Sequence, residues 1–175
     1  VNFVVETSDI AAHYYVRIQG MRFPISFFSE NKDILISGDF KDDRNIIANG
    51  SDAQQLINDY NAEMKNFSNQ SKELFEKYEI ASKKNDETAI QAIESEYEQV
   101  EKNQTTYQNL FLTKNSNSFV APYILYNNRY NYELNELEDF VNNFNIKEEN
   151  IYSKLLDEYI AALQRVDIGQ PYLDF

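Results

Sequence analysis

The segment 56–81, LINDYNAEMKNFSNQSKELFEKYEIA, and the segment 90–111, IQAIESEYEQVEKNQTTYQNLF, decide the fold of this chain. Apolar residues recur in both at spacings of three and four, as in a helix that buries one face against another helix. In the first segment this seam consists of Leu56, Tyr60, Met64, Phe67, Leu74, Tyr78 and Ala81, with Ser71 as its polar member. In the second it consists of Ile90, Ile93, Tyr97, Val100, Gln104, Tyr107 and Phe111. The pattern predicts two helices of about 25 to 30 residues that pack as an antiparallel hairpin.

Polar residues at the ends of these segments suit helix termini. Ser51 and Gln54 have the spacing of a capping box, which satisfies free N–H groups at a helix start. Lys83 and Lys84 place positive charge at the end of the first helix, where the helix dipole favours it. Asp86 can then cap the second helix. We therefore expect a tight connection between the two helices.

Short β-type runs fill residues 1–50, which also hold three of the four glycines. The runs are the alternating Phe3, Val5 and Thr7, followed by 15–18, 22–28, 34–36 and 46–47. Glycine and asparagine at 20–21 and 30–33 suit hairpin turns. Pro24 predicts an edge strand or a bulge, because proline cannot donate to a ladder. We expect an antiparallel β-meander, or a partial sandwich that lacks its first strands.

Three further helices are predicted after the polar break at 115–118. Ser118 can cap the first, from Phe119 to about Tyr130, in which Pro122 falls in the tolerated first turn. The second covers 134–144, and the third runs from about Glu148 to Arg165. The apolar stripe expected to be buried on the third helix consists of Ile151, Leu155, Tyr159, Ala162 and Val166.

The strands precede the helices along the chain, so the predicted fold class is α+β. We expect one domain with a β portion, 1–50, and a helical portion, 51–166. Residues 167–175 contain Gly169 and Pro171 and have no helical period. This composition is typical of a linker into a further domain.

Composition excludes several classes of function. The chain of 175 residues has 16 basic and 29 acidic side chains, a net charge of -13, one histidine and no cysteine. Nucleic-acid binding is disfavoured, because affinity for phosphates depends on Lys and Arg. Thiolate nucleophiles and Cys-ligated metal centres are absent, and His13 has no second histidine to form a His-rich site. We assign no catalytic, cofactor-binding or metal-binding residue and expect no cofactor. No stretch of about 18 apolar residues predicts a membrane span, and no signal peptide is evident.

Several clusters have both a functional and a structural interpretation, and the structural one is favoured for each. The acidic residues Glu94, Glu96, Glu98 and Glu101 suit the solvated face of a helix better than an acid–base pair. Asp39, Asp42 and Asp43 suit an acidic loop, because they lack the ligand spacing of an EF-hand. His13 is expected at the surface or as a cap. The tyrosines Tyr123, Tyr126, Tyr130 and Tyr132 are expected to pack between the short helices and the hairpin rather than to stack on a ligand.

The order of three motifs resembles one known family. The motifs are 27–36 with 47–51 (FFSENKDILI and IANGS), 117–123 (NSFVAPY) and 168–175 (IGQPYLDF). They are similar to the N-terminal domain of unknown function that precedes a thioredoxin-like domain in envelope thiol-disulfide oxidoreductases of the peroxiredoxin (AhpC/TSA) and TlpA/ResA-like group. The likeness spans nearly the whole chain.

The resemblance implies a non-catalytic accessory domain that positions or dimerises a C-terminal thioredoxin-like domain. In the family, the Asp-Phe of the last motif enters that domain, and its Cys-x-x-Cys lies further downstream. The family is exported to the periplasm or cell envelope of Gram-negative bacteria, often with an N-terminal lipid anchor. Two alternatives stay open at this point: a free-standing module that binds a ligand or a protein, and a homodimer formed through the helical seams.

Overall fold

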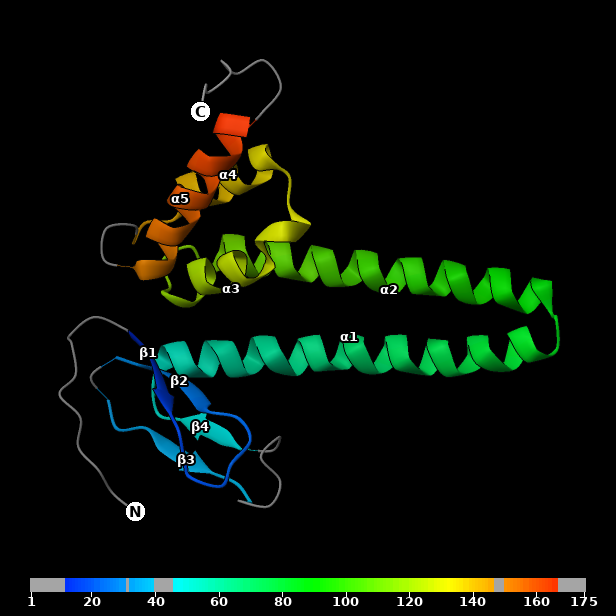
Figure 1. Ribbon diagram of the computed structural model, residues 1–175, viewed down its shortest axis with the longest axis horizontal. Helices are drawn as coiled ribbons and strands as arrows, with labels where there is room; N and C mark the ends of the chain where they lie inside the picture. The colour runs from blue at the N-terminus through cyan, green and yellow to red at the C-terminus, as the bar shows by residue number, and fades with distance from the viewer. Residues whose placement is uncertain (1–11, 31, 40–45, 147–149, 167–175) are drawn as a thin grey trace, which may run out of the picture. The chain divides into compact units, whose positions relative to one another are not determined.

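The computed structural model describes residues 12–30, 32–39, 46–146 and 150–166 (Figure 1). Its strands are β1 (Ala12–Val16), β2 (Ile25–Ser29), β3 (Leu35–Ser37) and β4 (Ile47–Asn49). Its helices are α1 (Asp52–Lys83), α2 (Glu87–Lys114), α3 (Val120–Asn128), the 3-10 helix η1 (Arg129–Asn131), α4 (Leu134–Asn143) and α5 (Ile151–Val166). Strands followed by helices confirm the predicted α+β class. The expected strand at Phe3, Val5 and Thr7, the loop residues Asp42 and Asp43, and the linker 167–175 lie outside the described residues.

The chain divides into two compact units. One contains the residues up to Ile57 together with those from Asn115 onward, and the other contains Asn58–Lys114. The strands, the first turns of α1 and the helices α3 to α5 belong to the first unit. The second unit consists of the helical hairpin, which therefore interrupts the first unit along the chain.

The predicted hairpin is confirmed. Helix α1 has 32 residues and α2 has 28, and the two lie side by side and antiparallel (Figure 1). The buried residues Phe67, Leu74 and Val100 form its core, and Met64, Ile93 and Tyr107 pack against them. All six belong to the two predicted seams. Apolar spacing along the sequence was thus sufficient to identify the faces on which the helices meet.

Three residues, Lys84, Asn85 and Asp86, connect the helices of the hairpin. Asn85 takes the left-handed conformation, with φ of 51°, and its N–H donates to the carbonyl of Ser82 at 3.1 Å. The N–H of Asp86 donates to the carbonyl of Ala81, also at 3.1 Å. Together these bonds form a Schellman motif, which satisfies the last carbonyls of a helix. The carboxylate of Asp86 accepts the N–H of Ala89 at 3.1 Å, so the residue that completes one helix end also caps the next helix.

The start of α1 is bonded to strand β2. The Ser51 hydroxyl accepts the N–H of Gln54 at 3.0 Å and donates to the carbonyl of Phe28 at 2.8 Å. The Gln54 side-chain oxygen accepts the N–H of Phe28 at 2.7 Å. The Glu30 carboxylate accepts the N–H of Ala53 at 3.0 Å, which places negative charge at a helix N-terminus, where it is stabilising. The predicted capping residues therefore cap the helix and also hold a strand against it.

The described strands pair differently from a continuous meander. Strand β1 pairs with β2 and β3 pairs with β4, both antiparallel, in two separate sheets. The turn predicted around Gly20 lies in the β1–β2 loop, where Gly20 has φ of 93°. Pro24 immediately precedes β2 and so leaves its ladder intact. The segment from Glu30 to Asp33, expected to be a hairpin turn, instead connects the two sheets. Its path explains Gly50, because a Cβ there would collide with the backbone carbonyl of Asp33.

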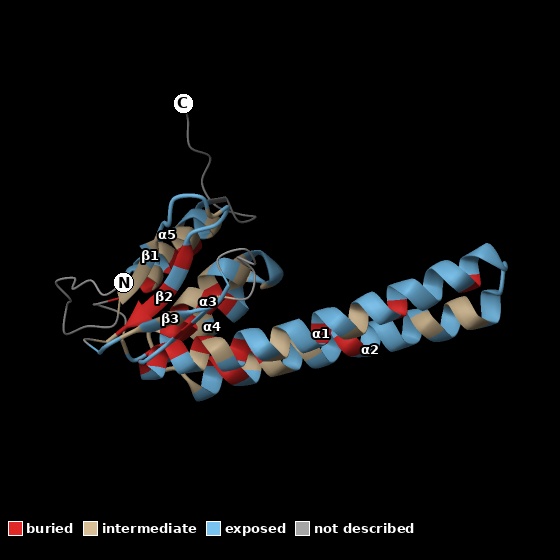
Figure 2. Cartoon of the chain, turned by 90° about the horizontal axis from the view of Figure 1, so that it is seen from below, coloured by how far each residue is buried: buried red, intermediate tan, exposed pale blue. Residues whose placement is uncertain are grey.

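Helices α3, α4 and α5 complete the first unit. Helix α5 contacts both α3 and α4. The contacts bury Ile124 and Leu125 of α3, Leu137 of α4 and Leu156 of α5, each at most 1% exposed. These three helices thus share one apolar core, and Figure 2 shows their buried residues in red.

The predicted apolar stripe of α5 does not contain the most buried residues of the helix. The helix begins at Ile151, after Asn150, whose side chain accepts the N–H of Tyr152 at 2.8 Å, and the start expected near Glu148 lies outside the described residues. The buried side chains on the helix are Ser153, Leu156 and Ile160, whereas Ile151 is 65% exposed and Ala162 is also exposed. Apolar residues lie on both sides of this helix, and the side that contacts α3 and α4 also contains the small, fully buried Ser153.

The stability of the hairpin should depend on the apolar side chains that are buried between α1 and α2. Leu74→Asp would bury a charge without a partner and should lower the free energy of unfolding by several kcal/mol, about 3 or more. Glu96→Ala, on an exposed position of α2, should change it by less than about 0.5 kcal/mol. Urea denaturation followed by circular dichroism measures both. Equal losses in the two variants would contradict the assignment of helix faces.

The cap of α1 gives a second stability prediction. Ser51→Ala removes the acceptor for the Gln54 N–H and leaves the buried Phe28 carbonyl without its hydroxyl donor, so it should cost about 1 to 3 kcal/mol. Ser95→Ala, at an exposed position within α2, is the matched control and should be neutral or slightly stabilising. If Ser51→Ala is as mild as the control in the same denaturation experiment, the bonds to β2 do not stabilise the fold.

Candidate functional site

His13 lies at the centre of an aromatic cluster in the first unit. It stands opposite Phe28 in the β1–β2 ladder, and the two rings stack with centroids 4.6 Å apart and an interplanar angle of 7°. Tyr123 of α3 meets the imidazole edge-on at 4.8 Å. The hydroxyl of Tyr152, at the start of α5, lies 2.7 Å from His13 Nδ1. One side chain of β1 thus joins the sheet to two helices.

The cluster is electrically neutral at physiological pH. Burial lowers the pKa of His13 to about 4, because the charged imidazolium would lose its hydration. Burial also raises the pKa of Tyr152 and of Tyr123, with a smaller contribution from the neighbouring Tyr15 in each case. The Tyr15 hydroxyl lies 3.3 Å from His13 Nδ1, on the same ring nitrogen as Tyr152. The hydroxyls of Tyr152 and Tyr15 thus both lie beside the same ring nitrogen of His13.

This geometry gives His13 a structural role. Its Nδ1 lies beside the hydroxyl of Tyr152, whose pKa is raised by burial, so the pair holds the ring in place and is poorly suited to proton transfer. The expectation of a surface or capping histidine is wrong, because the ring is half-buried between strands and helices. No sequence pattern could reveal the cluster, since 139 residues separate His13 from Tyr152.

Two of the four tyrosines considered as an alternative stacking platform, Tyr126 and Tyr130, contact Arg129 of the same chain. The Arg129 guanidinium lies 4.2 Å from the ring centroid of Tyr126, 4.2 Å from that of Tyr130 and 5.2 Å from that of Tyr159. Its nitrogens donate to the Tyr126 carbonyl and the Tyr130 hydroxyl, both at 2.7 Å. An arginine among three tyrosine rings is a stabilising cation–π arrangement.

The remaining two tyrosines of the proposed platform also pack within the first unit. Tyr123 contacts Phe28 of β2, with ring centroids 5.2 Å apart, and it belongs to the His13 cluster. Tyr132 meets Phe140 of α4 edge-on at 5.6 Å. Structural packing is therefore confirmed for these rings, although their contacts here are with β2 and α4, whereas packing against the hairpin was expected.

The acidic candidates are solvated. Glu94, Glu96, Glu98 and Glu101 are exposed on α2, and Asp39 is exposed in the loop after β3. Within the described ranges, no three His, Asp or Glu side chains are grouped so as to hold a metal ion. Among the helices described, none combines the length and apolarity that crossing a bilayer requires.

The single histidine permits a direct test of the cluster, because its imidazole gives one unambiguous NMR signal. The titration midpoint in the folded chain should lie near pH 4, compared with about 6.5 in urea. The folded pKa is the lower one, so the contribution of His13 to stability is complete above pH 6.5 and declines as the pH falls toward 4. In His13→Phe, the free energy of unfolding should fall less between pH 6.5 and pH 4 than in the unchanged chain. A folded-state midpoint at or above 6.5 would show that the ring is not packed as described.

No protein family, no characterised protein and no solved structure matches this chain. The function proposed for the chain consequently rests on its own residues and on the resemblance described above.

Proposed function

We propose that this chain is a non-catalytic accessory domain of a cell-envelope thiol-disulfide oxidoreductase, in which it positions a thioredoxin-like domain. The observation that carries the proposal is the hairpin, a separately packed unit with its own core of Phe67, Leu74 and Val100. At 1.5 Å per residue, a helix of 28 residues extends about 42 Å. A stiff arm of this length suits spacing or pairing of domains. The order of the three motifs, which resembles that of the oxidoreductase family, is the reason for proposing that the neighbouring domain is thioredoxin-like.

The chemistry of disulfide exchange explains why the proposed role of this chain is positioning rather than catalysis. Exchange requires a thiolate that attacks a disulfide sulfur, and this chain contains no cysteine. In the protein that we propose, the thioredoxin-like domain supplies the redox pair. By the same resemblance, we place the protein in the periplasm or cell envelope of a Gram-negative bacterium, where members of that family often carry an N-terminal lipid anchor.

The alternative of a free-standing ligand-binding module has less support from the geometry. It relied on the sheet face and the tyrosine-rich helices, where Tyr126 and Tyr130 enclose Arg129 and Tyr123 packs on His13. These contacts engage one face of each ring, although Tyr130 is still 72% exposed. We therefore favour the accessory role.

The proposal is tested by comparing this chain with the longer protein from which it would derive. Insulin reduction by dithiothreitol should proceed at the uncatalysed rate with residues 1–175 and faster with a protein that continues into a Cys-x-x-Cys domain. Sequencing the gene past the codon for Phe175 shows whether such a longer protein is encoded. Catalysis by the chain alone, or a stop codon directly after Phe175, would contradict the proposal.

A further inference from the structure

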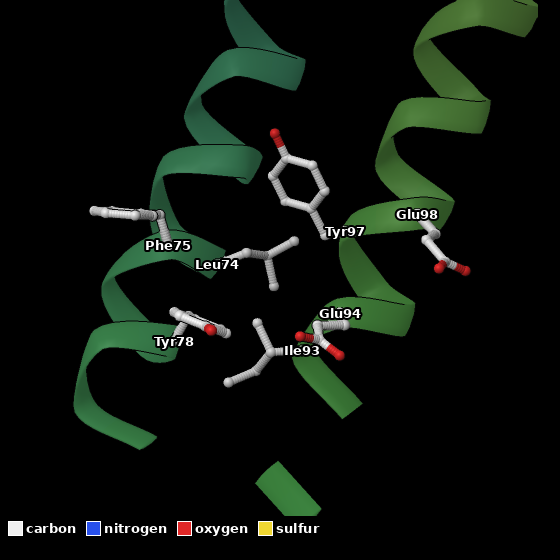
Figure 3. A pocket seen from close by; sticks show the side chains of 7 residues that line it. All are labelled: Leu74, Phe75, Tyr78, Ile93, Glu94, Tyr97 and Glu98. Carbon is white, nitrogen blue, oxygen red and sulfur yellow. The ribbon is translucent and has the colours of Figure 1, made fainter. Parts of the chain in front are cut away.

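An apolar groove runs between the two helices near the far end of the hairpin (Figure 3). Its volume is about 410 Å³. It is lined by Leu74, Phe75 and Tyr78 of α1 and by Ile93, Glu94, Tyr97 and Glu98 of α2. Figure 3 shows Leu74, Ile93 and Tyr97 between the two helices, with Glu94 and Glu98 on the α2 side. Only two helices contribute to the lining, so the groove is open along the side that neither helix covers.

The hairpin leaves this part of its seam poorly covered. Phe75 is 60% exposed, Tyr97 40% and Tyr78 37%. No residue of α2 from Glu87 to Gln99 is buried, although Ile90, Ile93 and Tyr97 belong to the predicted seam. Adjoining exposed aromatic side chains are unusual on a surface that faces only water, and they indicate a place where another molecule packs.

The α2 side of the groove is acidic, whereas residues 72–79 of α1 contain three glutamates and two lysines. Residues 87–101 contain five glutamates and no lysine or arginine. Two of these glutamates, Glu94 and Glu98, line the groove one helical turn apart, and neither forms an ion pair with another residue of the described ranges. An occupant would therefore gain most by presenting cations beside its apolar side chains.

We propose that the groove binds an amphipathic helix of a partner protein, with an apolar stripe that covers Phe75, Tyr78 and Tyr97 and with Lys or Arg residues beside Glu94 and Glu98. A third helix is the shape that fits a trough between two helices whose apolar residues recur at spacings of three and four. Residues that flank such a seam commonly pair with opposite charges on the neighbouring helix, and they select the partner.

A second copy of the chain is a weaker candidate for this surface. Each copy carries a net charge of -13, so two copies repel each other. The surface also offers the aromatic side chains that dominate protein interfaces, which a basic helix could bury without that repulsion. The charge of the groove thus favours a cationic helix over self-association.

Two synthetic peptides of about three heptads test the proposal. Both carry leucine at the a and d positions; one has lysine at the e and g positions and the other has glutamate there. The lysine peptide should bind the full 175-residue chain in isothermal titration calorimetry. When the lysine peptide is added, the amide NMR signals of the chain that change position should be confined to the residues that line the groove. The glutamate peptide should bind about tenfold more weakly or not at all.

Variants of the groove separate apolar from electrostatic contributions. Phe75→Ser and Tyr97→Ser remove exposed rings without emptying the buried core, and each should weaken the lysine peptide about tenfold. The double variant Glu94→Gln with Glu98→Gln should weaken it about threefold to tenfold and reduce the difference between the peptides. Its control, Glu73→Gln with Glu96→Gln, changes the charge equally at exposed positions outside the groove and should alter affinity less than about twofold.

Three results would overturn the proposal. The first is equal affinity of the two peptides for the chain. The second is a change in the amide NMR signals of residues outside the groove when the lysine peptide is added. The third comes from sedimentation of the chain alone: a dimer that Phe75→Ser dissociates would identify a second copy as the occupant. These outcomes are independent of the insulin assay, so this inference and the proposed redox role can fail separately.

Discussion

The backbone N–H and C=O of Phe28 are both bonded to side chains at the start of α1, those of Gln54 and Ser51. The other parts of the structure depend on this connection, because it fixes where the long helix begins and where the first sheet lies against it. Glu30 strengthens it with a carboxylate on the free N–H of Ala53. Because Gly50 has no Cβ, the backbone at Asp33 can pass close to it, and these bonds can form. Strand, connection and helix start thus form one hydrogen-bonded structure in which buried polar groups have partners.

The same strand pair also brings the distant end of the chain into the first unit. On one face of β1 and β2, His13 and Phe28 meet Tyr123 and Tyr152, so the rings that pack the sheet also orient α3 and α5. Neutral His13 serves this arrangement better than a charged group would, because a charge among aromatic rings would lose its hydration. The histidine that might first be examined for catalysis is thereby explained as a packing residue.

The sequence predicted those features that depend on neighbouring residues. Seam spacing identified the hairpin, and Ser51, Asp86 and Ser118 marked helix starts, because caps act within one turn of the helix. Features that depend on distant residues were missed. The pairing of strands into two sheets, the His13 cluster and the Arg129 enclosure join residues with no common period. On α5, the most buried residues lie on the side that contacts α3 and α4, and the apolar residues of the helix alone did not identify them.

The hairpin leaves the first unit after Ile57 and the chain re-enters it at Asn115. The first and last turns of the hairpin lie side by side, since the rings of Tyr60 and Phe111 are 5.0 Å apart. Removing one heptad from each helix would therefore preserve the register of the seam and shorten the arm by about 10 Å. Arm length is thus separable from the rest of the fold, so related proteins could evolve arms of different reach by inserting or losing paired heptads while the first unit stays the same.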